Sequence, residues 1–275
     1  MSRLPTLFIS HGAPTYALAP GSAGRQLTAL GTSLPKPDAV LVVSPHWMTR
    51  EARVGAARHP ETIHDFGGFP SALYELQYPA SGHLTLAART CQALSAAGWN
   101  ATLEDQRGLD HGAWVPLRHL YPDADVPAFQ VSMPARLDAN AAYAFGQALG
   151  TLADEGVLVI GSGSLTHNLY EFRSRDGAEP AYAREFVEWV RHAATTGDHD
   201  RLKQTLALAP QAQRAHPSAE HFLPLLVAAG AAGERSSVAV LDGGFTHGVL
   251  SMESYVFGSA PDAAQGRGHQ ETTHA

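Results

Sequence analysis

Three short apolar runs, each followed by a histidine, constrain this chain more than any other feature of its sequence. The first to consider is Ala39–Val43, five hydrophobic residues rich in valine, which is typical of a strand buried on both faces. Ser44 and Pro45 then end the predicted strand, because proline has no N–H to donate to a neighbouring strand, and His46 follows at once. An ionisable side chain at the exit of a buried strand lies where open α/β folds bind their ligands.

The same arrangement occurs twice more along the chain. Leu7–Ser10 leads directly into His11, and Val157–Ile160 leads through a loop of small residues to His167. In open α/β sheets, ligands bind outside the carboxyl ends of the strands. Three strand exits that each carry a histidine therefore predict a metal site at the C-terminal edge of the sheet.

The remaining sequence alternates between strand-like and helix-like segments. This alternation predicts one α/β domain over residues 1–258, with a central, mostly parallel or mixed sheet flanked by helices. We expect a long helix over Asp138–Glu155 and an N-cap at Ser218 for the last apolar helix. Loops as long as Pro60–Ala80 are usually either functional or disordered. This loop has several aromatic residues and few charges, which favours a pocket wall or lid over disorder. Residues 259–275 are polar and aperiodic, which predicts a disordered tail.

Composition excludes several classes of protein. The net charge is −7 and no run of lysine or arginine occurs, which argues against binding of nucleic acid. The single cysteine, Cys91, rules out a disulfide framework or a zinc site built from several cysteines, and we interpret it as a small buried hydrophobe. The first strand begins too early to leave room for a signal peptide, and no apolar run is long enough to span a membrane. We expect a cytoplasmic monomer or homodimer without a membrane partner.

His11 and His46 are the strongest candidates for metal ligands. Both follow a buried strand and have small or turn-forming neighbours that leave room for an ion. His221 is the third candidate, and Glu220 competes with it, because two histidines and one carboxylate form the facial triad of non-haem iron(II) oxygenases. Neighbours on a helix point about 100° apart, so we expect one of the two to face the metal. Imidazole suits iron, zinc, copper and nickel, and residue type does not choose between them.

Further polar residues are candidates for catalysis and substrate binding. His167 is either a fourth ligand or a general acid/base, since its pKa near neutrality suits proton transfer. The pairs Asp110–His111 and His64–Asp65 are expected to hydrogen-bond substrate or orient ligands, unless they only stabilise their loops. The other nine histidines are predicted to lie on the surface or in the tail: His59, His83, His119, His192, His199, His216, His247, His269 and His274.

Aromatic residues near these positions supply an apolar wall. The candidates are Trp47, Phe66, Phe69 and Trp114. Gly161–Ser164 resembles a phosphate-binding loop only loosely, because it lacks the Gly-x-Gly-x-x-Gly spacing and a following lysine.

Six ordered motifs resemble the DOPA dioxygenase branch of the class III extradiol ring-cleavage dioxygenases. They are Phe8–Pro14, Ser44–Trp47, Thr62–Pro70, Leu109–Trp114, Ser164–Leu169 and Glu220–Leu226. The resemblance implies one α/β domain that binds a single metal ion and opens a catechol ring with O₂ next to one hydroxyl. It also implies that His11 and His46 are ligands, that His167 is the acid/base or an additional ligand, and that His221 stands where protocatechuate-cleaving relatives have a glutamate ligand.

The leading hypothesis is an extradiol dioxygenase acting on a catechol-type, DOPA-like aromatic and O₂. Its catalytic residues are His167 and His111, and its substrate contacts are His64, Asp65, Asp110, Trp47 and Phe66. One divalent metal ion per chain is expected. Active enzyme requires Fe(II), since Zn(II) is redox-inert, although Zn(II) is an alternative occupant. Three histidines and a water equally describe a zinc-dependent hydrolase, and a non-catalytic metal-binding module is the third hypothesis.

Overall fold

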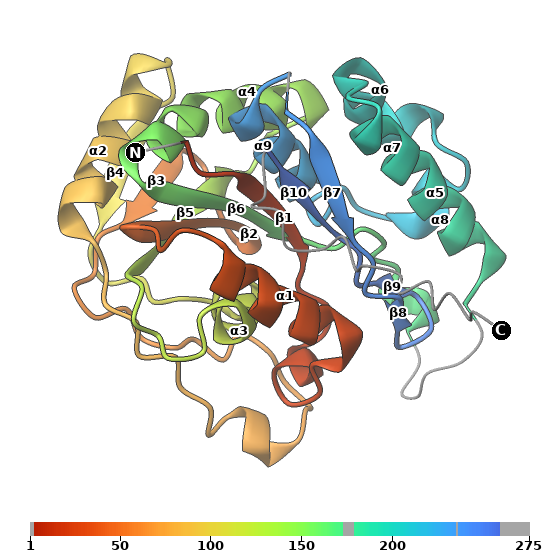
Figure 1. Ribbon diagram of the computed structural model, residues 1–275, viewed down its shortest axis with the longest axis horizontal. Coiled ribbons are helices and arrows are strands. Elements are labelled where there is room, and N and C mark those ends of the chain that lie inside the picture. Colours follow the sequence, from red (N-terminus) through yellow and green to blue (C-terminus); the bar gives the residue numbers. More distant parts are fainter. Residues whose placement is uncertain (1–2, 173–178, 235, 259–275) are drawn as a thin grey trace, which may run out of the picture.

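The fold is organised around an eight-stranded mixed sheet with helices on both faces (Figure 1). The computed structural model describes residues 3–172, 179–234 and 236–258. The sheet has the order β4-β3-β5-β2-β6-β1-β10-β7. Its strands are β1 (Thr6–Ser10), β2 (Ala39–Thr49), β3 (Ala52–Gly55), β4 (Ala101–Glu104), β5 (Ala128–Pro134), β6 (Val157–Gly163), β7 (Val238–Leu241) and β10 (Ser254–Phe257). A separate two-stranded hairpin pairs β8 (Phe245–Thr246) with β9 (Leu250–Ser251).

The centre of the sheet is parallel, and an antiparallel pairing joins each margin to it. Strands β5, β2, β6 and β1 pair in parallel, whereas β10 runs antiparallel to both β1 and β7. On the other side, β3 is antiparallel to β5 and parallel to β4. The prediction of one α/β domain with a mixed sheet flanked by helices is confirmed. The parallel centre brings the carboxyl ends of β2, β6 and β1 to the same edge.

Helices cover both faces of this sheet. They are α1 (Gly21–Ser33), α2 (Leu84–Ala96), α3 (His111–Leu120), α4 (Ala139–Leu149), α5 (Ala181–Thr195), α6 (His199–Lys203), α7 (Thr205–Leu208), α8 (Ala212–Ala215) and α9 (Leu223–Ala232). The described residues also form the short 3₁₀ helices η1 (Pro14–Ala17), η2 (Ser71–Leu73), η3 (Gly150–Glu155) and η4 (Leu169–Glu171). Helices α1 and α3 lie on one face, and α2, α4 and α9 lie on the other (Figure 1).

The alternation of side chains along β2 builds two hydrophobic cores. Ala39, Leu41 and Val43 pack into the core on the α4–α9 face, while Val40 and Val42 pack into the core on the α1–α3 face. All five are fully buried. A strand with both faces covered needs apolar residues at every position, and this is the reason for the uninterrupted hydrophobic run.

Strand β2 does not end at Ser44 and Pro45, as the sequence predicts. It continues to Thr49, with a break in register between Ser44, which pairs with Ser132, and Met48, which pairs with Met133. A bulge leaves the residues between these pairs without ladder partners, so proline is tolerated there. His46 therefore lies in the bulge, without a ladder partner, at the edge of the sheet where the other predicted histidines are expected.

Three other predicted boundaries differ in the structure. The Asp110–His111 pair, expected in a loop, lies at the start of helix α3, because Asp110 is extended and occupies the N-cap position. The long helix predicted for Asp138–Glu155 becomes α4 followed by η3. Ser218 does not cap α9, which begins at Leu223, and its hydroxyl donates instead to Glu220. The short strands β4, β8 and β9 are not predicted, since each has too few residues to show a period.

Three histidines predicted to be exposed are buried. His119 lies 3.0 Å from the carbonyl oxygen of Tyr16 and His216 lies 2.9 Å from that of Leu165. His199 hydrogen-bonds the Tyr143 hydroxyl. A buried neutral imidazole needs one such partner, and the sequence alone does not show which carbonyl supplies it. His269, His274 and the predicted disordered tail lie outside the described residues.

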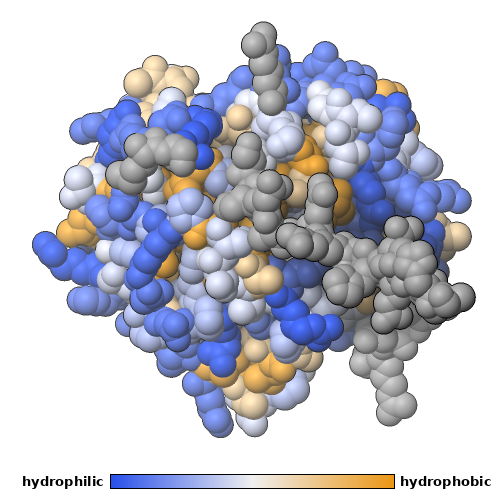
Figure 2. All heavy atoms as spheres, viewed as in Figure 1, coloured by the Kyte–Doolittle hydropathy of each residue, from blue (hydrophilic) through white to orange (hydrophobic). Residues whose placement is uncertain are grey.

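The hydropathy of the surface and of the helices can be compared with the prediction that the protein has no membrane partner. In the view of Figure 2 most of the surface is hydrophilic or intermediate, and hydrophobic residues form small separate patches. Among the helices of the described ranges, none has both the length and the apolar character needed to cross a membrane.

The predicted loop Pro60–Ala80 contains only η2 and an isolated bridge between Thr62 and Leu109. Cys91 is half-buried in α2, and its thiol donates to the carbonyl of Ala101.

Candidate metal centre

Five histidines from distant parts of the chain converge at the carboxyl edge of the parallel strands. His11 follows β1, His46 lies in the β2 bulge, His111 begins α3, His167 follows β6, and His221 precedes α9. The ring centre of His11 lies 5.0 Å from that of His46, 5.5 Å from that of His111 and 5.6 Å from that of His221. His167 stacks on His221 with 3.5 Å between ring centres. The fold therefore brings together the histidines predicted as metal ligands or catalytic groups.

Three of these imidazoles are placed to share one ion. One nitrogen from each of His11, His46 and His221 lies within 4.8 Å of the others, and the Nε2 atoms of His11 and His46 are 3.2 Å apart. With metal–nitrogen bonds of about 2.1 Å, neighbouring ligand nitrogens lie about 3.0–3.4 Å apart. The Nε2 atom of His221 is buried and has no hydrogen-bond partner among the described residues. A divalent cation fits this set of donors.

Hydrogen bonds at the opposite ring nitrogens orient two of these donors. Ser162 donates its hydroxyl hydrogen to the carbonyl of Gly112, so its oxygen accepts the Nδ1–H of His11 at 3.0 Å. Glu220 accepts the Nδ1–H of His221, also at 3.0 Å. Both rings then present an unprotonated Nε2 to the cluster, the tautomer that metal binding requires. The carboxylate of Glu220 lies behind His221, so of the two neighbours it is the imidazole that points its free nitrogen inward.

Asp65 connects His46 with His111. Its carboxylate accepts the backbone N–H of His111 at 2.9 Å and the Nδ1–H of the same residue at 3.0 Å. It also lies 3.6 Å from Nδ1 of His46. The Asp65 side chain is only 20% exposed. One carboxylate thus orients a candidate ligand and a candidate catalytic group together.

Burial keeps His11, His46, His167 and His221 neutral. It lowers the pKa of His11 well below its usual value, with a further contribution from His46. Burial, followed by His111 and His221, lowers the pKa of His46 to about 2. Burial and the neighbouring His221 lower the pKa of His167 to about 3. Neutral imidazoles are the form that binds metal ions, so the site needs no deprotonation at neutral pH.

Two glycines of β6 allow His221 to reach the cluster. A Cβ atom on Gly161 would lie 2.0 Å from the carbonyl oxygen of Pro224, and one on Gly163 would lie 2.3 Å from that of His221. The N–H of Ser164 donates to the same His221 carbonyl. Gly161–Ser164 only loosely resembles a phosphate-binding loop. Its glycines are needed for a different reason, because the start of α9 packs closely against β6.

Gly112 gives the same kind of clearance beside His46. A Cβ atom there would lie 2.3 Å from the Ser44 hydroxyl, 3.0 Å from Cδ2 of His46 and 3.1 Å from Oδ1 of Asp110. Asp110 itself is fully buried and accepts hydrogen bonds from Ser44 and Gln130. Burial raises its pKa. The structure thus places Asp110 in a buried polar network with Ser44 and Gln130.

The aromatic residues predicted for the pocket wall separate into two groups. Phe66 is half-buried and its ring centre lies 5.6 Å from that of His111 and 5.6 Å from that of Phe69. His64 packs against Phe66 and hydrogen-bonds the Leu76 carbonyl, and both lie within the loop after β3. Trp114 is fully buried and donates to the Ile63 carbonyl.

Trp47 and Arg107 form the other group. Trp47 is buried, and the guanidinium carbon of Arg107 lies 5.4 Å from its ring centre. Arg107 also donates to the carbonyl of His46. Two further residues hold cluster residues in place and were not predicted from the sequence: Arg107, which donates to the His46 carbonyl, and Ser162, which accepts from His11. Ser162 could have been proposed from the sequence, because it lies on the strand that leads to His167. Nothing in the sequence around Arg107 indicates a role at this site.

The sequence matches the family described as the catalytic LigB subunit of aromatic ring-opening dioxygenase over residues 5–258. It is 41% identical over 259 residues to a 4,5-DOPA dioxygenase extradiol of Beta vulgaris, covering 92% of this chain and 96% of the relative. An Escherichia coli K12 protein of the same description is 37% identical over 261 residues, covering 94% of this chain and 96% of the relative.

A solved structure is similar along almost its whole length. The crystal structure of an uncharacterized protein from Escherichia coli K12 superposes with a TM-score of 0.76 at 31% sequence identity, covering 93% of this chain and 100% of that one. Family, relatives and fold agree with the resemblance seen in the motifs. This chain belongs to the LigB family of aromatic ring-opening dioxygenases.

Proposed function

We propose that this protein is a metal-dependent extradiol dioxygenase that opens the ring of a catechol-type, DOPA-like aromatic with O₂. The observation that carries the proposal is the convergence of His11, His46 and His221, with a buried and unpartnered Nε2 on His221. Catechol-cleaving chemistry follows from the family, and the DOPA-like class follows from the names of relatives in Beta vulgaris and Portulaca grandiflora.

Iron(II) is the metal we propose for the active enzyme, held by His11, His46 and His221. Such an ion supplies Lewis acidity toward the catechol oxygens and, unlike zinc, the electrons needed to activate dioxygen. Three protein ligands leave open coordination positions for exogenous molecules. Glu220, Ser162 and Asp65 act from behind the ligands, since each contacts the Nδ1 side of a ring.

His167 is the proposed acid/base. It stacks on His221, next to the proposed ligands, so its imidazole is placed to accept a proton from a catechol hydroxyl and later return it to the opening ring. His111 is the proposed second polar group. Asp65 accepts its Nδ1–H, which leaves Nε2 as its acceptor atom. Phe66, against His111, is proposed as the apolar contact of the substrate ring.

Oxygen uptake with a panel of catechols tests the proposal. Iron-loaded protein should consume O₂ and form a coloured ring-fission product with at least one catechol, and His167→Asn should lower kcat by about 10²–10⁴-fold while retaining iron. Under argon no product should form. Zinc-loaded protein that hydrolyses esters or amides under argon, with no catechol turnover by the iron form, would favour the hydrolase instead.

A further inference from the structure

Two sets of candidate metal donors share His46. The inner set is the one described above, His11, His46 and His221. The outer set consists of His46, Asp65 and His111, whose donor atoms also lie within 4.8 Å of one another. Oδ2 of Asp65 lies 3.0 Å from Nδ1 of His111 and 3.6 Å from Nδ1 of His46. These distances are close to the spacing of ligand atoms around one ion, which is about 3.0–3.4 Å.

The two sets use opposite nitrogens of the His46 ring. Nε2 of His46 lies 3.2 Å from Nε2 of His11, in the inner set, whereas Nδ1 faces the Asp65 carboxylate. A neutral imidazole has one unprotonated nitrogen and can offer either one by changing its tautomer. One side chain is therefore common to both donor sets.

The outer set is the more accessible of the two. The side chains of His46 and Asp65 are 21% and 20% exposed. His11 is only 2% exposed and His221 only 7%. A hydrated ion can thus contact the outer set directly, whereas the donors that only the inner set contains are screened from solvent.

We propose that the outer set is an entry site, which captures a divalent transition-metal cation from solvent and passes it to the inner set through His46. Two imidazoles and one carboxylate are donors that suit iron(II) and zinc. The entry site deepens the function proposed above, since it rests on the inner set as the resident metal site.

Asp65 is held in place for this role by its second oxygen. Oδ1 accepts the backbone N–H of His111, so the carboxylate stays at the start of α3 when Oδ2 binds an ion. The Nδ1–H proton of His111 moves to Nε2 when Nδ1 becomes a donor, and this change of tautomer leaves the ring neutral. His46 then exchanges Nδ1 for Nε2 as the ion passes from Asp65 to the buried imidazoles.

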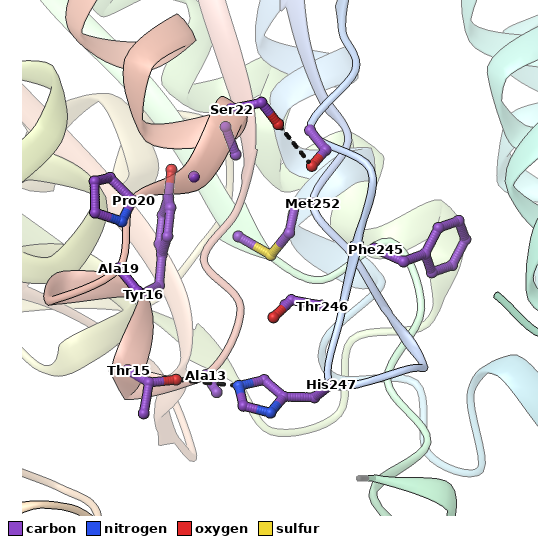
Figure 3. A pocket seen from close by; sticks show the side chains of 13 residues that line it. Ala13, Thr15, Tyr16, Ala19, Pro20, Ser22, Phe245, Thr246, His247 and Met252 are labelled. Atoms are coloured by element: carbon purple, nitrogen blue, oxygen red, sulfur yellow. Dashed lines mark hydrogen bonds between the residues drawn. The ribbon is translucent and has the colours of Figure 1, made fainter. Parts of the chain in front are cut away.

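The cavity in Figure 3 provides no comparable set of donors among the described residues. It has a volume of about 610 Å³ and lies between the segment through η1 and the segment around the β8–β9 hairpin. Its described lining contains one histidine, His247, which hydrogen-bonds Thr15, and no carboxylate. Met252 also lines it and packs on the backbone beside His11, since a Cβ atom on Gly12 would lie 2.7 Å from the Met252 sulfur. Entry through the outer set is therefore favoured.

Zinc binding to a variant without the inner set tests whether the outer set holds an ion. The double substitution His11→Ala/His221→Ala removes two inner donors and leaves the outer set complete. We expect this variant to bind one zinc ion in competition with a chromophoric chelator, and the added substitution Asp65→Asn to abolish that binding. Adding Asp105→Asn instead, at an exposed position after β4, should leave the zinc affinity unchanged.

The rate of metal uptake tests the entry role. Stopped-flow mixing of metal-free protein with Co²⁺, followed by the absorbance of the bound ion, gives the association rate constant. Asp65→Asn should lower this constant about tenfold or more, because the charge that attracts the cation is lost. His111→Asn, which keeps the backbone N–H bonded to Asp65, should also slow uptake. Glu220→Gln should keep the wild-type association rate and raise the dissociation rate, since this carboxylate supports His221 from behind.

Any one of three results would rule out the entry site. The first is a zinc affinity of the double variant that is the same with and without Asp65→Asn. The second is an equal uptake rate for Asp65→Asn and Asp105→Asn. The third is slow uptake by Glu220→Gln with normal uptake by Asp65→Asn, which would place the entrance beside Glu220. Failure of the inner metal assignment has a different signature, because His221→Ala would then bind Co²⁺ as tightly as the wild type.

Discussion

Glu220 and His221 are neighbours in the chain, and the carboxylate of the first holds the Nδ1 atom of the second at 3.0 Å. This hydrogen bond lowers the pKa of Glu220 to about 2, so the side chain is a carboxylate at neutral pH. The His221 ring is thereby turned so that its unpartnered Nε2 faces His11 and His46. The pair acts as an oriented donor, with the carboxylate supporting the imidazole from behind.

Replacing Glu220 should therefore weaken metal binding without abolishing it. Partners that support a metal ligand contribute about 10–100-fold in affinity, so Glu220→Gln should lose at most that much. His221→Ala should lose considerably more, because a donor atom disappears. Competition with a chromophoric chelator measures both. If Glu220→Gln were as damaging as His221→Ala, the carboxylate would be a ligand in its own right.

Asp65→Asn should uncouple His111 from the site. The carboxylate accepts two N–H groups of His111, whereas an amide can accept one and would turn its NH₂ toward the other. We expect a loss of about 1–3 kcal/mol in unfolding free energy, measured by urea titration, and a fall in kcat larger than the change in KM. Asp105→Asn, at an exposed position after β4, is the control and should match the wild type. If Asp65→Asn and Asp105→Asn had the same unfolding free energy, kcat and KM, Asp65 would have no role in positioning His111.

Gly112→Ala should damage the metal site through packing alone. The added methyl group would lie 2.3 Å from the Ser44 hydroxyl and 3.0 Å from the His46 ring, so these groups must move. Overpacking of this kind costs about 1–3 kcal/mol, and the displaced His46 should also lower metal affinity. Gly67→Ala serves as the control, because nothing lies within 4 Å of its Cβ position. Thermal unfolding and chelator competition should leave the control unchanged.

His216 should make the protein less stable in mild acid. Burial lowers the pKa of His216 to about 4, whereas the unfolded chain titrates near 6.5. Between these values the unfolded state binds more protons, so the unfolding free energy falls as pH falls, by up to about 3 kcal/mol from this one residue. Above pH 6.5 the histidine is neutral in both states and contributes no pH dependence.

His216→Gln tests this account, since the amide can still donate to the Leu165 carbonyl but does not titrate. Urea unfolding of both proteins at several pH values between 4 and 7 should show a shallower acid loss in the variant. The exposed substitution His192→Gln should leave the wild-type pH profile unaltered. Parallel curves for His216→Gln and wild type would contradict the assignment.

The sequence alone was sufficient for the fold class and for the histidines at the strand exits. Apolar runs such as Ala39–Val43 and Val157–Ile160 indicate strands that are buried on both faces. This can be recognised from the local sequence, because such strands need an apolar residue at every position. The motif resemblance led to the family that the comparisons confirm. The roles of His11, His46 and His221 as ligands stay predictions until a metal is measured.

Only the tertiary structure decided how these residues support one another. The bulge that turns out His46 depends on pairing with β5, and the buried positions of His119, His199 and His216 depend on partners far away in the chain. Ser162, Asp65 and Glu220 acquire their roles through the ring nitrogens they contact. Strand order and helix packing determine these contacts. The contacts therefore produce no recognisable periodicity or spacing in the local sequence.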